Sequence, residues 1–215
     1  MTKPQDRYLD LIKRVIVNTI YGGPNPYPVT PRMSPAEVAL LTSVLRMTRH
    51  YFEFGMGGST VLASRLASGK VYAVESEPTW IQKVRATIPL EEDRVHLIQA
   101  DIGPTKEWGY PAELGTPEIY ARYHTEPLAT SGESIDTFFV DGRFRVACCC
   151  SIALIIRTDS VLLVHDYRSR PQYHIIESFF KPISEAEDLT CFVRRSEIDI
   201  EFITRLRKIY ATKAE

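Results

Sequence analysis

Short apolar runs alternate with helical patterns through the middle of the chain. Five runs predict β-strands, at residues 50–54, 70–75, 95–100, 135–140 and 161–164. The stretches between and after them predict helices, at residues 59–67, 78–87, 144–157 and 171–180. Strand runs such as residues 137–140 are apolar throughout, which is typical of strands that are covered on both faces. The alternation predicts the α/β class, with a doubly wound, Rossmann-like sheet of mainly parallel strands.

Two helical patterns precede the first predicted strand. Residues 7–21 repeat apolar residues at helical spacing up to a Gly-Gly-Pro stop. Ser34 then precedes Pro35 and Glu37, which predicts a capped helix that runs to about residue 46 or 47. We therefore expect residues 1–215 to form a single domain, in which an N-terminal helical extension (residues 1–48) precedes a Rossmann-like core (residues 49–210).

Two later segments depart from the alternation. Residues 189–194 and 198–203 are strand-like runs joined by a short polar turn, which predicts a C-terminal antiparallel hairpin that closes the sheet. Residues 102–133 follow neither period, and long irregular insertions of this kind are usually lids or binding loops. Its aromatic residues suit stacking on a substrate, or a small core of the lid itself: Trp108, Tyr110, Tyr120 and Tyr123.

Composition narrows the classes of function. The 215 residues include 26 basic and 27 acidic side chains, so no net positive field attracts nucleic acid or an anionic membrane. No apolar run reaches the roughly 18 residues of a membrane helix, and residues 1–6 lack the apolar region of a secretory signal, so we expect a cytoplasmic protein. The run of cysteines at 148–150, with Cys191 apart, fits neither disulfides nor a metal site and is interpreted as buried thiols.

A glycine-rich turn follows the first predicted strand, with the sequence Gly55-Met56-Gly57-Gly58-Ser59-Thr60. Ligands of an open parallel sheet bind outside the carboxyl ends of its strands, and glycines allow the backbone to bend sharply and approach a ligand. A nicotinamide-binding fingerprint would require its third glycine at position 60, where this chain has threonine.

Acidic residues mark the first three predicted strands: Glu53 on the first, Glu75 at the end of the second and Asp101 after the third. With the glycine-rich turn, they resemble motif I and the following motifs of class I S-adenosylmethionine-dependent methyltransferases. The resemblance implies that Glu53 meets the methionine end of S-adenosylmethionine, Glu75 its ribose hydroxyls and Asp101 its adenine amine. A dinucleotide remains the alternative ligand, because Glu75 would serve its ribose equally well. The expected cofactor-binding residues are Glu53, Gly55, Met56, Gly57, Ser59, Thr60, Glu75, Ser76, Asp101 and Asp141.

The fourth and fifth predicted strands end in candidate catalytic residues, Asp141 after the fourth and His165 with Asp166 after the fifth. Methyl transfer to a hydroxyl requires that the acceptor be positioned and lose its proton. Carboxylates suit a divalent ion such as Mg²⁺ or Mn²⁺, so Asp141 and Asp166 are predicted metal ligands. Metal-free base catalysis by His165 or Asp166 is the alternative mechanism. Purely structural roles are also open, with Asp141 as a helix cap and His165 as a neutral histidine in the core.

This layout is similar to that of metal-dependent O-methyltransferases of the catechol type and of those that act on antibiotic sugars. The catechol pattern has Asp-Asn where this chain has Asp166-Tyr167, so one expected ligand is missing. Residues 7–21 resemble the opening of the macrocin O-methyltransferase family, and a looser likeness covers residues 51–183. The resemblance implies a sugar or glycan hydroxyl as acceptor, with a catechol or another small molecule as the alternative. Arginines that suit a phosphate or ring oxygen are Arg143, Arg145, Arg168 and Arg170.

Other classes of function fit less well. A nucleic-acid methyltransferase would have an Asn-Pro-Pro-Tyr-like motif after the fourth strand, where this chain has Asp141-Gly142-Arg143. We therefore expect no nucleic-acid partner and no membrane partner. The helix predicted at residues 7–21 suits packing or a homodimer contact. A cofactor-binding module without catalysis remains possible on sequence grounds.

Overall fold

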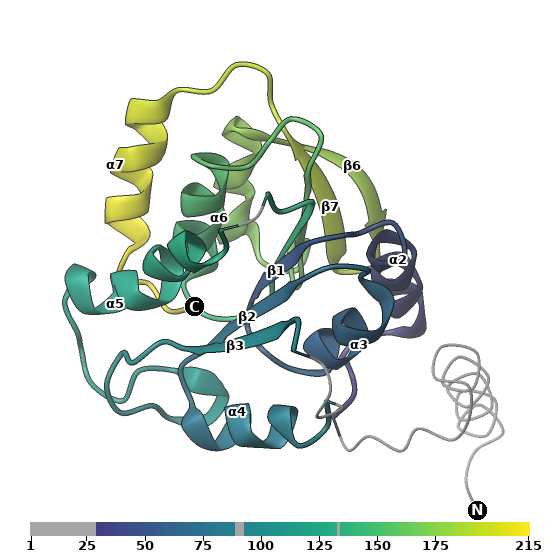
Figure 1. Cartoon of the computed structure of the whole chain (residues 1–215). Helices are drawn as coiled ribbons and strands as arrows, with labels where there is room; N and C mark the ends of the chain where they lie inside the picture. The colour runs from purple at the N-terminus through teal and green to yellow at the C-terminus, as the bar shows by residue number, and fades with distance from the viewer. Residues whose placement is uncertain (1–28, 89–92, 133) are drawn as a thin grey trace, which may run out of the picture.

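The computed structural model describes residues 29–88, 93–132 and 134–215, so the helix predicted at residues 7–21 lies outside the described residues. Seven strands form one sheet in the order β3-β2-β1-β4-β5-β7-β6 (Figure 1). The strands are β1 (Tyr51–Phe54), β2 (Val71–Glu75), β3 (Val95–Gln99), β4 (Thr137–Val140), β5 (Val161–Val164), β6 (Phe180–Ala186) and β7 (Leu189–Arg194). All five predicted parallel strands are confirmed, each within two residues of its predicted bounds.

The strand order reverses between β1 and β4. The chain runs from β1 outward to β2 and β3, then returns to the other side of β1 as β4 and β5, all in parallel. The hairpin of β6 and β7 closes the sheet, with β7 antiparallel to β5. This confirms the doubly wound sheet, and its switch point between β1 and β4 is where open α/β sheets bind their ligands.

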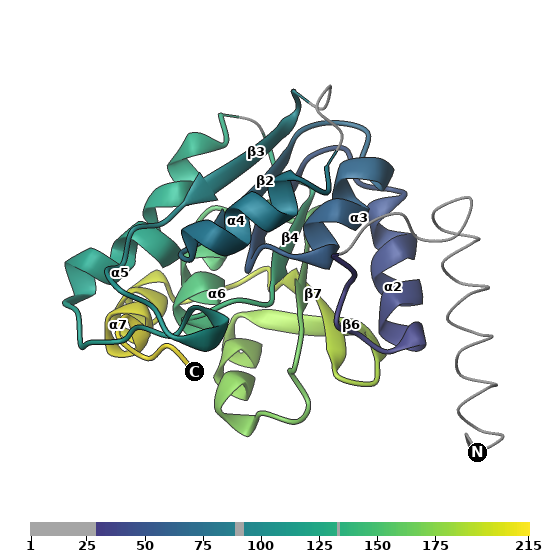
Figure 2. The ribbon, with the colours of Figure 1, turned by 90° about the horizontal axis from the view of Figure 1, so that it is seen from below.

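Helices cover both faces of the sheet. One face carries α2, α3 and α4, which lie in a row, and the other carries α5, α6 and α7 (Figures 1 and 2). Alternate residues of β1 serve the two layers, because Tyr51 packs with α2 and α3 whereas Phe52 and Phe54 pack with α5, α6 and α7. The helices are α2 (Pro35–Leu45), α3 (Gly58–Leu66), α4 (Pro78–Arg85), α5 (Pro117–His124), α6 (Arg145–Ala153) and α7 (Ile200–Tyr210).

Helix α2 begins as the sequence predicts. The Ser34 hydroxyl accepts a hydrogen bond from the Glu37 N–H at 3.3 Å, and the Glu37 carboxylate accepts one from the Ser34 N–H at 2.7 Å. This reciprocal capping box satisfies two backbone donors at the start of the helix. It also fixes the Glu37 carboxylate, which is buried beside the carboxyl ends of the strands.

The position of the C-terminal hairpin was predicted wrongly. Residues 189–194 form β7 as expected, but its hairpin partner is β6, and residues 198–203 instead lead into α7. Asp199 caps α7 by accepting a hydrogen bond from the Phe202 N–H at 2.9 Å. Strand β6 is a mostly exposed edge strand with a bulge beside Pro182, so it shows no apolar alternation. The helix predicted to reach residue 180 is a 3₁₀-helix, η3 (Pro171–Ser178).

The insertion at residues 102–133 is more ordered than its sequence indicates. It contains α5, capped by Thr116, and two short 3₁₀-helices, η1 (Glu107–Gly109) and η2 (Glu126–Thr130). Tyr120 and Tyr123 lie on α5 and are buried, which agrees with the alternative that they form a small core, although Tyr123 also lines the cavity described below. Trp108 and Tyr110 are the exposed pair.

The cysteines agree with their interpretation as buried thiols. Cys148, Cys149 and Cys150 are free and buried in α6, and Cys191 is buried on β7 rather than on a helix. Within the described ranges, no helix is both long enough and apolar enough to traverse a bilayer.

Candidate active site

A cavity of about 660 Å³ opens at the switch point of the sheet. Its floor is the turn after β1, and its sides are the ends of β2 and β4. Residues 30–33 and the insertion complete its walls. The sequence pattern predicted a lid or binding loop at the insertion, but it did not predict the wall formed by residues 30–33. Its lining comprises Thr30, Pro31, Arg32, Met33, Gly55, Met56, Gly57, Gly58, Ser59, Glu75, Glu77, Trp80, Thr105, Lys106, Glu107, Trp108, Gly109, Tyr123, Asp141, Gly142 and Arg143.

The glycines of the turn are required by close backbone contacts. Gly55 has a φ of 101°, and a Cβ built on it would lie 2.4 Å from the backbone nitrogen of Gly142, so the turns after β1 and β4 touch. A Cβ built on Gly58 would lie 2.0 Å from the backbone of Thr30 and Pro31. A Cβ built on Gly57 has no neighbour within 4 Å. The turn is therefore clamped on two sides and open on the third.

Glu53 lies beneath this turn and is fully buried. Tyr51 donates its hydroxyl to Glu53 Oε2 at 2.9 Å, and Thr60, whose hydroxyl also accepts from the Gly57 N–H, donates to Oε1. Burial raises the pKa of Glu53 to about 8, although the hydrogen bonds from Thr60 and its neighbours oppose the shift. Glu53 does not line the cavity, so its carboxylate braces the turn from behind.

Glu75 lines the cavity at the end of β2. Its Oε1 accepts hydrogen bonds from the backbone N–H groups of Ser76 at 2.7 Å and Glu77 at 3.2 Å. Burial raises the pKa of Glu75, and these hydrogen bonds with the charge of Arg143 work against that shift. A Cβ built on Gly109 would lie 3.2 Å from Oε1, so the insertion covers this carboxylate.

Asp101 takes a different position from the one expected for an adenine-binding residue. It is exposed, accepts a hydrogen bond from the Gly103 N–H at 3.1 Å, and does not line the cavity. The insertion lines that side instead. Trp108 has a left-handed backbone with φ of 64°, and the Arg32 guanidinium lies 4.3 Å from the centre of its ring. Arg32 and Trp108 thus connect two walls of the cavity that are far apart in the chain.

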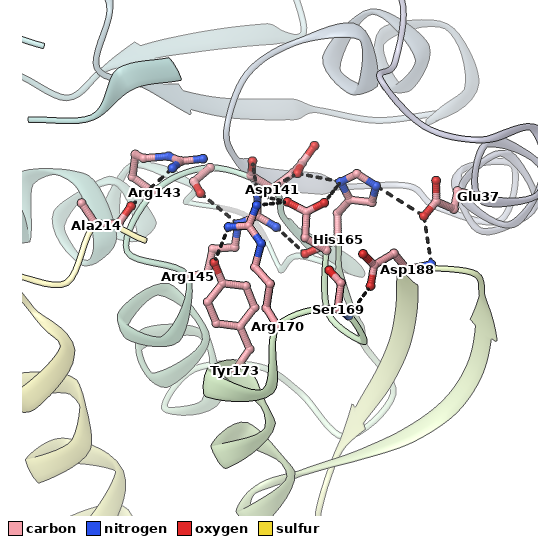
Figure 3. A network of polar contacts seen from close by, with 12 residues as sticks. Glu37, Asp141, Arg143, Arg145, His165, Ser169, Arg170, Tyr173, Asp188 and Ala214 are labelled. Carbon is pink, nitrogen blue, oxygen red and sulfur yellow. Dashed lines mark hydrogen bonds and ion pairs between the residues drawn. The ribbon is translucent and has the colours of Figure 1, made fainter. Parts of the chain in front are cut away.

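The three predicted catalytic residues lie together at the ends of β4 and β5, with ligand atoms within 4.8 Å of one another (Figure 3). His165 Nδ1 lies 2.9 Å from Asp141 Oδ1 and 3.6 Å from Asp166 Oδ1. His165 Nε2 faces Glu37 Oε1 at 3.5 Å. Of the three, Asp141 alone lines the cavity, so it connects the cavity to the cluster. Glu37 was missed by the sequence analysis because its position predicts only a helix cap.

Carboxylates at both ring nitrogens favour the charged form of His165. Burial by itself lowers the pKa of the imidazole, but the hydrogen bond and charge of Asp141, with the charges of Asp166 and Glu37, raise it above its ordinary value. An imidazole that keeps its proton acts as a cation within the cluster. The two aspartates, which are each about a quarter exposed, are the better placed proton acceptors.

Comparison with solved structures identifies the family. A methyltransferase-like protein from Silicibacter pomeroyi is 31% identical, with a TM-score of 0.77, and the match covers 86% of this chain and 98% of that protein. The chain belongs to this methyltransferase family. No protein-family model and no curated protein sequence matches the chain.

More distant structures share the fold of this methyltransferase. An O-methyltransferase from Bacillus cereus, solved with S-adenosylhomocysteine, is 14% identical with a TM-score of 0.50, over 89% of this chain and 92% of its own. The O-methyltransferase TomG from Streptomyces achromogenes, involved in tomaymycin synthesis and solved with S-adenosylmethionine, is 13% identical with a TM-score of 0.51, over 91% of this chain and all of its own. The fold is therefore that of class I methyltransferases.

The arginines of the methyltransferase fall into distinct environments. Arg145 is buried and turned toward the cluster, where its Nη2 lies 2.9 Å from Asp166 Oδ2 and 3.2 Å from Asp141 Oδ1. Arg170 pairs with the same Asp166 oxygen at 2.9 Å from a more exposed position. Arg143 lies over the Tyr110 ring at 4.1 Å, and Arg168 forms an exposed pair with Glu185. Arg145 and Arg170 thus contact carboxylates rather than facing a phosphate.

Proposed function

We propose that this methyltransferase uses S-adenosylmethionine to methylate a hydroxyl group of a sugar or glycan. One observation carries the proposal: a single cavity is lined by the glycine turn, by Glu75 and by Asp141, which belongs to the cluster with His165 and Asp166. The glycine turn offers an open face at Gly57, where a ligand meets no side chain. Glu75 offers a carboxylate at the end of β2, where paired ribose hydroxyls donate in related folds.

Asp141 is the residue that we assign to the acceptor. When bound, S-adenosylmethionine supplies an electrophilic methyl group on a sulfonium. Asp141 lines the cavity, and its carboxylate accepts the proton of an acceptor hydroxyl positioned there. His165 and Arg145 hold Asp141 Oδ1 from the opposite side, so the orientation of the carboxylate is fixed before the acceptor enters.

The predicted Mg²⁺ or Mn²⁺ ion does not fit this cluster well. Arg145 already pairs with Asp141 Oδ1 and Asp166 Oδ2, and His165 Nδ1 is directed at Asp141. A divalent ion on these atoms would lie against the buried guanidinium of Arg145, and like charges repel at such distances. Three possible ligand atoms within 4.8 Å favour the metal, but the guanidinium already in contact with both carboxylates favours the metal-free mechanism that we adopt.

The insertion supports a sugar acceptor. Trp108 and Tyr110 are its exposed aromatic residues, and Trp108 lines the cavity wall. Aromatic faces of this kind stack on the apolar faces of sugars, and the Arg143 guanidinium over Tyr110 adds hydrogen-bond donors nearby. A catechol-type acceptor, which would also stack on these rings, is the second candidate.

Cofactor binding is the first test. Titration calorimetry should show that S-adenosylhomocysteine binds the wild-type protein and that NAD does not. Replacing Glu75 by Gln should weaken that binding at least tenfold, roughly the loss of one charged hydrogen-bond pair to the ribose. The exposed Glu197→Gln variant should bind as the wild type does. Binding of NAD with no response to S-adenosylhomocysteine would reverse the choice of cofactor.

The acceptor requires its own assay. Transfer of labelled methyl from S-adenosylmethionine should be measured on a panel of glycosides and nucleotide sugars, with catechols alongside, before and after exhaustive EDTA treatment. We expect methylated glycosides and full activity after EDTA. Methylation of catechols alone would exclude the sugar, and activity that disappears with EDTA and returns with Mn²⁺ would exclude the metal-free mechanism.

A further inference from the structure

Arg145 occupies an unusual place for a cation. It is the first residue of α6, directly after Phe144, whose backbone is left-handed with φ of 54°. The amino end of a helix carries partial positive charge, so an arginine there opposes the helix dipole and contributes nothing to helix stability through it. Arg145 is also only 2% exposed. The reason for a buried guanidinium at this position must lie in what it contacts.

The guanidinium binds the ends of two neighbouring strands. Its Nε donates to the carbonyl of Gly142 at 3.0 Å, its Nη1 donates to the carbonyl of His165, and its Nη2 lies 3.3 Å from the carbonyl of Asp141. Nη2 also contacts the carboxylates of Asp141 and Asp166. Arg145 therefore contacts both the backbone and the acidic side chains of the turns after β4 and β5 (Figure 3).

Two carboxylates this close need a positive charge between them. Asp166 has a left-handed backbone with φ of 53°, an arrangement that costs energy for a residue other than glycine and points its side chain at Arg145. In metal-dependent enzymes, a bound ion supplies that charge between neighbouring acidic residues. Here a planar guanidinium lies between the two strand ends, and its donors suit two carboxylate partners.

We propose that Arg145 is a positioning residue that takes the place of a divalent metal ion, as a built-in cation that holds Asp141 and Asp166 side by side at the edge of the cavity. The proposal rests on the proposed function, because the effect of Arg145 on turnover is measured as methyl transfer. It concerns the cluster alone, so it assigns Arg145 no contact with S-adenosylmethionine. Loss of Arg145 should therefore affect turnover far more than cofactor binding.

The test compares Arg145→Met, which keeps most of the side-chain volume without the charge, with Arg145→Lys and with the exposed control Arg46→Met at the end of α2. We expect Arg145→Met to lower kcat roughly 100-fold, the scale for loss of one preorganised charged donor. Its Kd for S-adenosylhomocysteine should stay within about threefold of wild type, Arg145→Lys should recover part of kcat, and Arg46→Met should leave both unchanged. Absence of cofactor binding in the wild type would count against the proposed function and not against Arg145.

Metal binding gives a second readout that a merely structural role would not move. Electron paramagnetic resonance should detect no bound Mn²⁺ in the wild type, whereas Arg145→Met should take up Mn²⁺, because the buried guanidinium that bridges Asp141 and Asp166 is gone and the more exposed Arg170 pairs with Asp166 alone. Adding Asp141→Asn to that variant should abolish the uptake. Binding of Mn²⁺ by the wild-type protein in this assay would overturn the proposal, and this measurement does not require that Arg145→Met folds. A folded Arg145→Met variant with wild-type kcat would also overturn it.

Discussion

The carboxyl group of Glu53 has no contact with solvent in the folded protein. Burial raises its pKa from the ordinary 4.5 to about 8, so the folded protein favours the protonated side chain near neutral pH. Because the pKa of Glu53 is higher in the folded than in the unfolded protein, its contribution to the free energy of unfolding is fully present below pH 4.5. That contribution is lost as the pH rises through about 8. Glu53→Gln cannot ionise. Its stability relative to wild type should therefore increase between pH 5 and pH 9, by an amount on the order of a few kcal/mol.

Chemical denaturation at the two pH values measures this difference directly. Glu197→Gln, which removes an exposed carboxylate, should show almost the same difference from wild type at pH 5 and pH 9. Parallel pH profiles of wild type and Glu53→Gln would mean that Glu53 is ionised in the folded protein. In that case the hydrogen bonds from Tyr51 and Thr60 would outweigh the cost of burial.

The sequence predicted those site residues whose role follows from their place in the chain. Glu75 and Asp141 end apolar runs, so their positions at the edge of the sheet follow from strand geometry alone. Glu37 could not be found this way, because its partner His165 comes from another element and a helix cap explains its position locally. Arg145 was singled out for a phosphate or ring oxygen, and its carboxylate partners became evident only in the fold. Asp101 shows the opposite failure: it follows a strand as expected, but it binds the N–H of Gly103 and stays outside the cavity.

At the scale of elements, residues 30–33 make a close backbone contact with the start of α3 at the cavity. A Cβ on Gly58 would lie 2.0 Å from the backbone of Thr30 and Pro31, and backbone atoms cannot move aside as a flexible side chain can. Gly58→Ala should therefore lower the free energy of unfolding by about 1–3 kcal/mol, the usual cost of overpacking. It should also weaken cofactor binding, because residues 30–33 form one wall of the cavity.

Gly57→Ala is the matched control for this change. It adds the same methyl group one residue earlier in the same turn, where no atom lies within 4 Å. In the absence of ligand, its stability should stay within about 0.5 kcal/mol of wild type. Equal losses in both variants would show that the turn tolerates no side chain at all, whatever the position of residues 30–33.

Burial on both faces made most of the strands predictable, and the half-exposed edge strand β3 was found from its apolar residues at 95, 97 and 98. β1, β2, β4 and β5 lie inside the sheet, so their residues are almost all apolar and their bounds can be read from composition. β6 lies at the edge with mostly exposed residues, and its pattern resembles a loop. α7 begins with Ile200 exposed and Ile203 buried. A run of apolar residues this short does not distinguish a helix from a strand.

For the whole molecule, the cavity is formed by segments that only the complete fold brings together. The sheet supplies the floor, and residues 30–33 face the insertion across the opening. The Arg32 guanidinium over the Trp108 ring joins these two walls. No local pattern predicts this contact, because it depends on the helix layer that holds residues 30–33 against α3 and on the crossover that places the insertion beyond β3.

If the contact between Arg32 and Trp108 helps to close the cavity over the cofactor, its loss should weaken binding without affecting the cluster of Asp141. Arg32→Met removes the charge and keeps the apolar stem. A partly exposed cation–π pair contributes about 0.5–1 kcal/mol. We therefore expect the Kd for S-adenosylhomocysteine to rise roughly two- to fivefold in this variant. Arg46→Met, on the exposed end of α2, should leave Kd unchanged.

Tryptophan fluorescence reports on the same closure, because both tryptophans of the chain line the cavity. Trp80 is anchored by a hydrogen bond to the carbonyl of Met56, whereas Trp108 is mostly exposed and held by Arg32. Cofactor that draws the walls together should therefore change the emission of Trp108 more than that of Trp80. The response to S-adenosylhomocysteine should shrink in Trp108→Phe and persist in Trp80→Phe. A response that persists in Trp108→Phe and shrinks in Trp80→Phe, together with wild-type binding by Arg32→Met, would contradict the prediction. It would mean that the ligand contacts only the floor of the cavity and does not draw the two walls together.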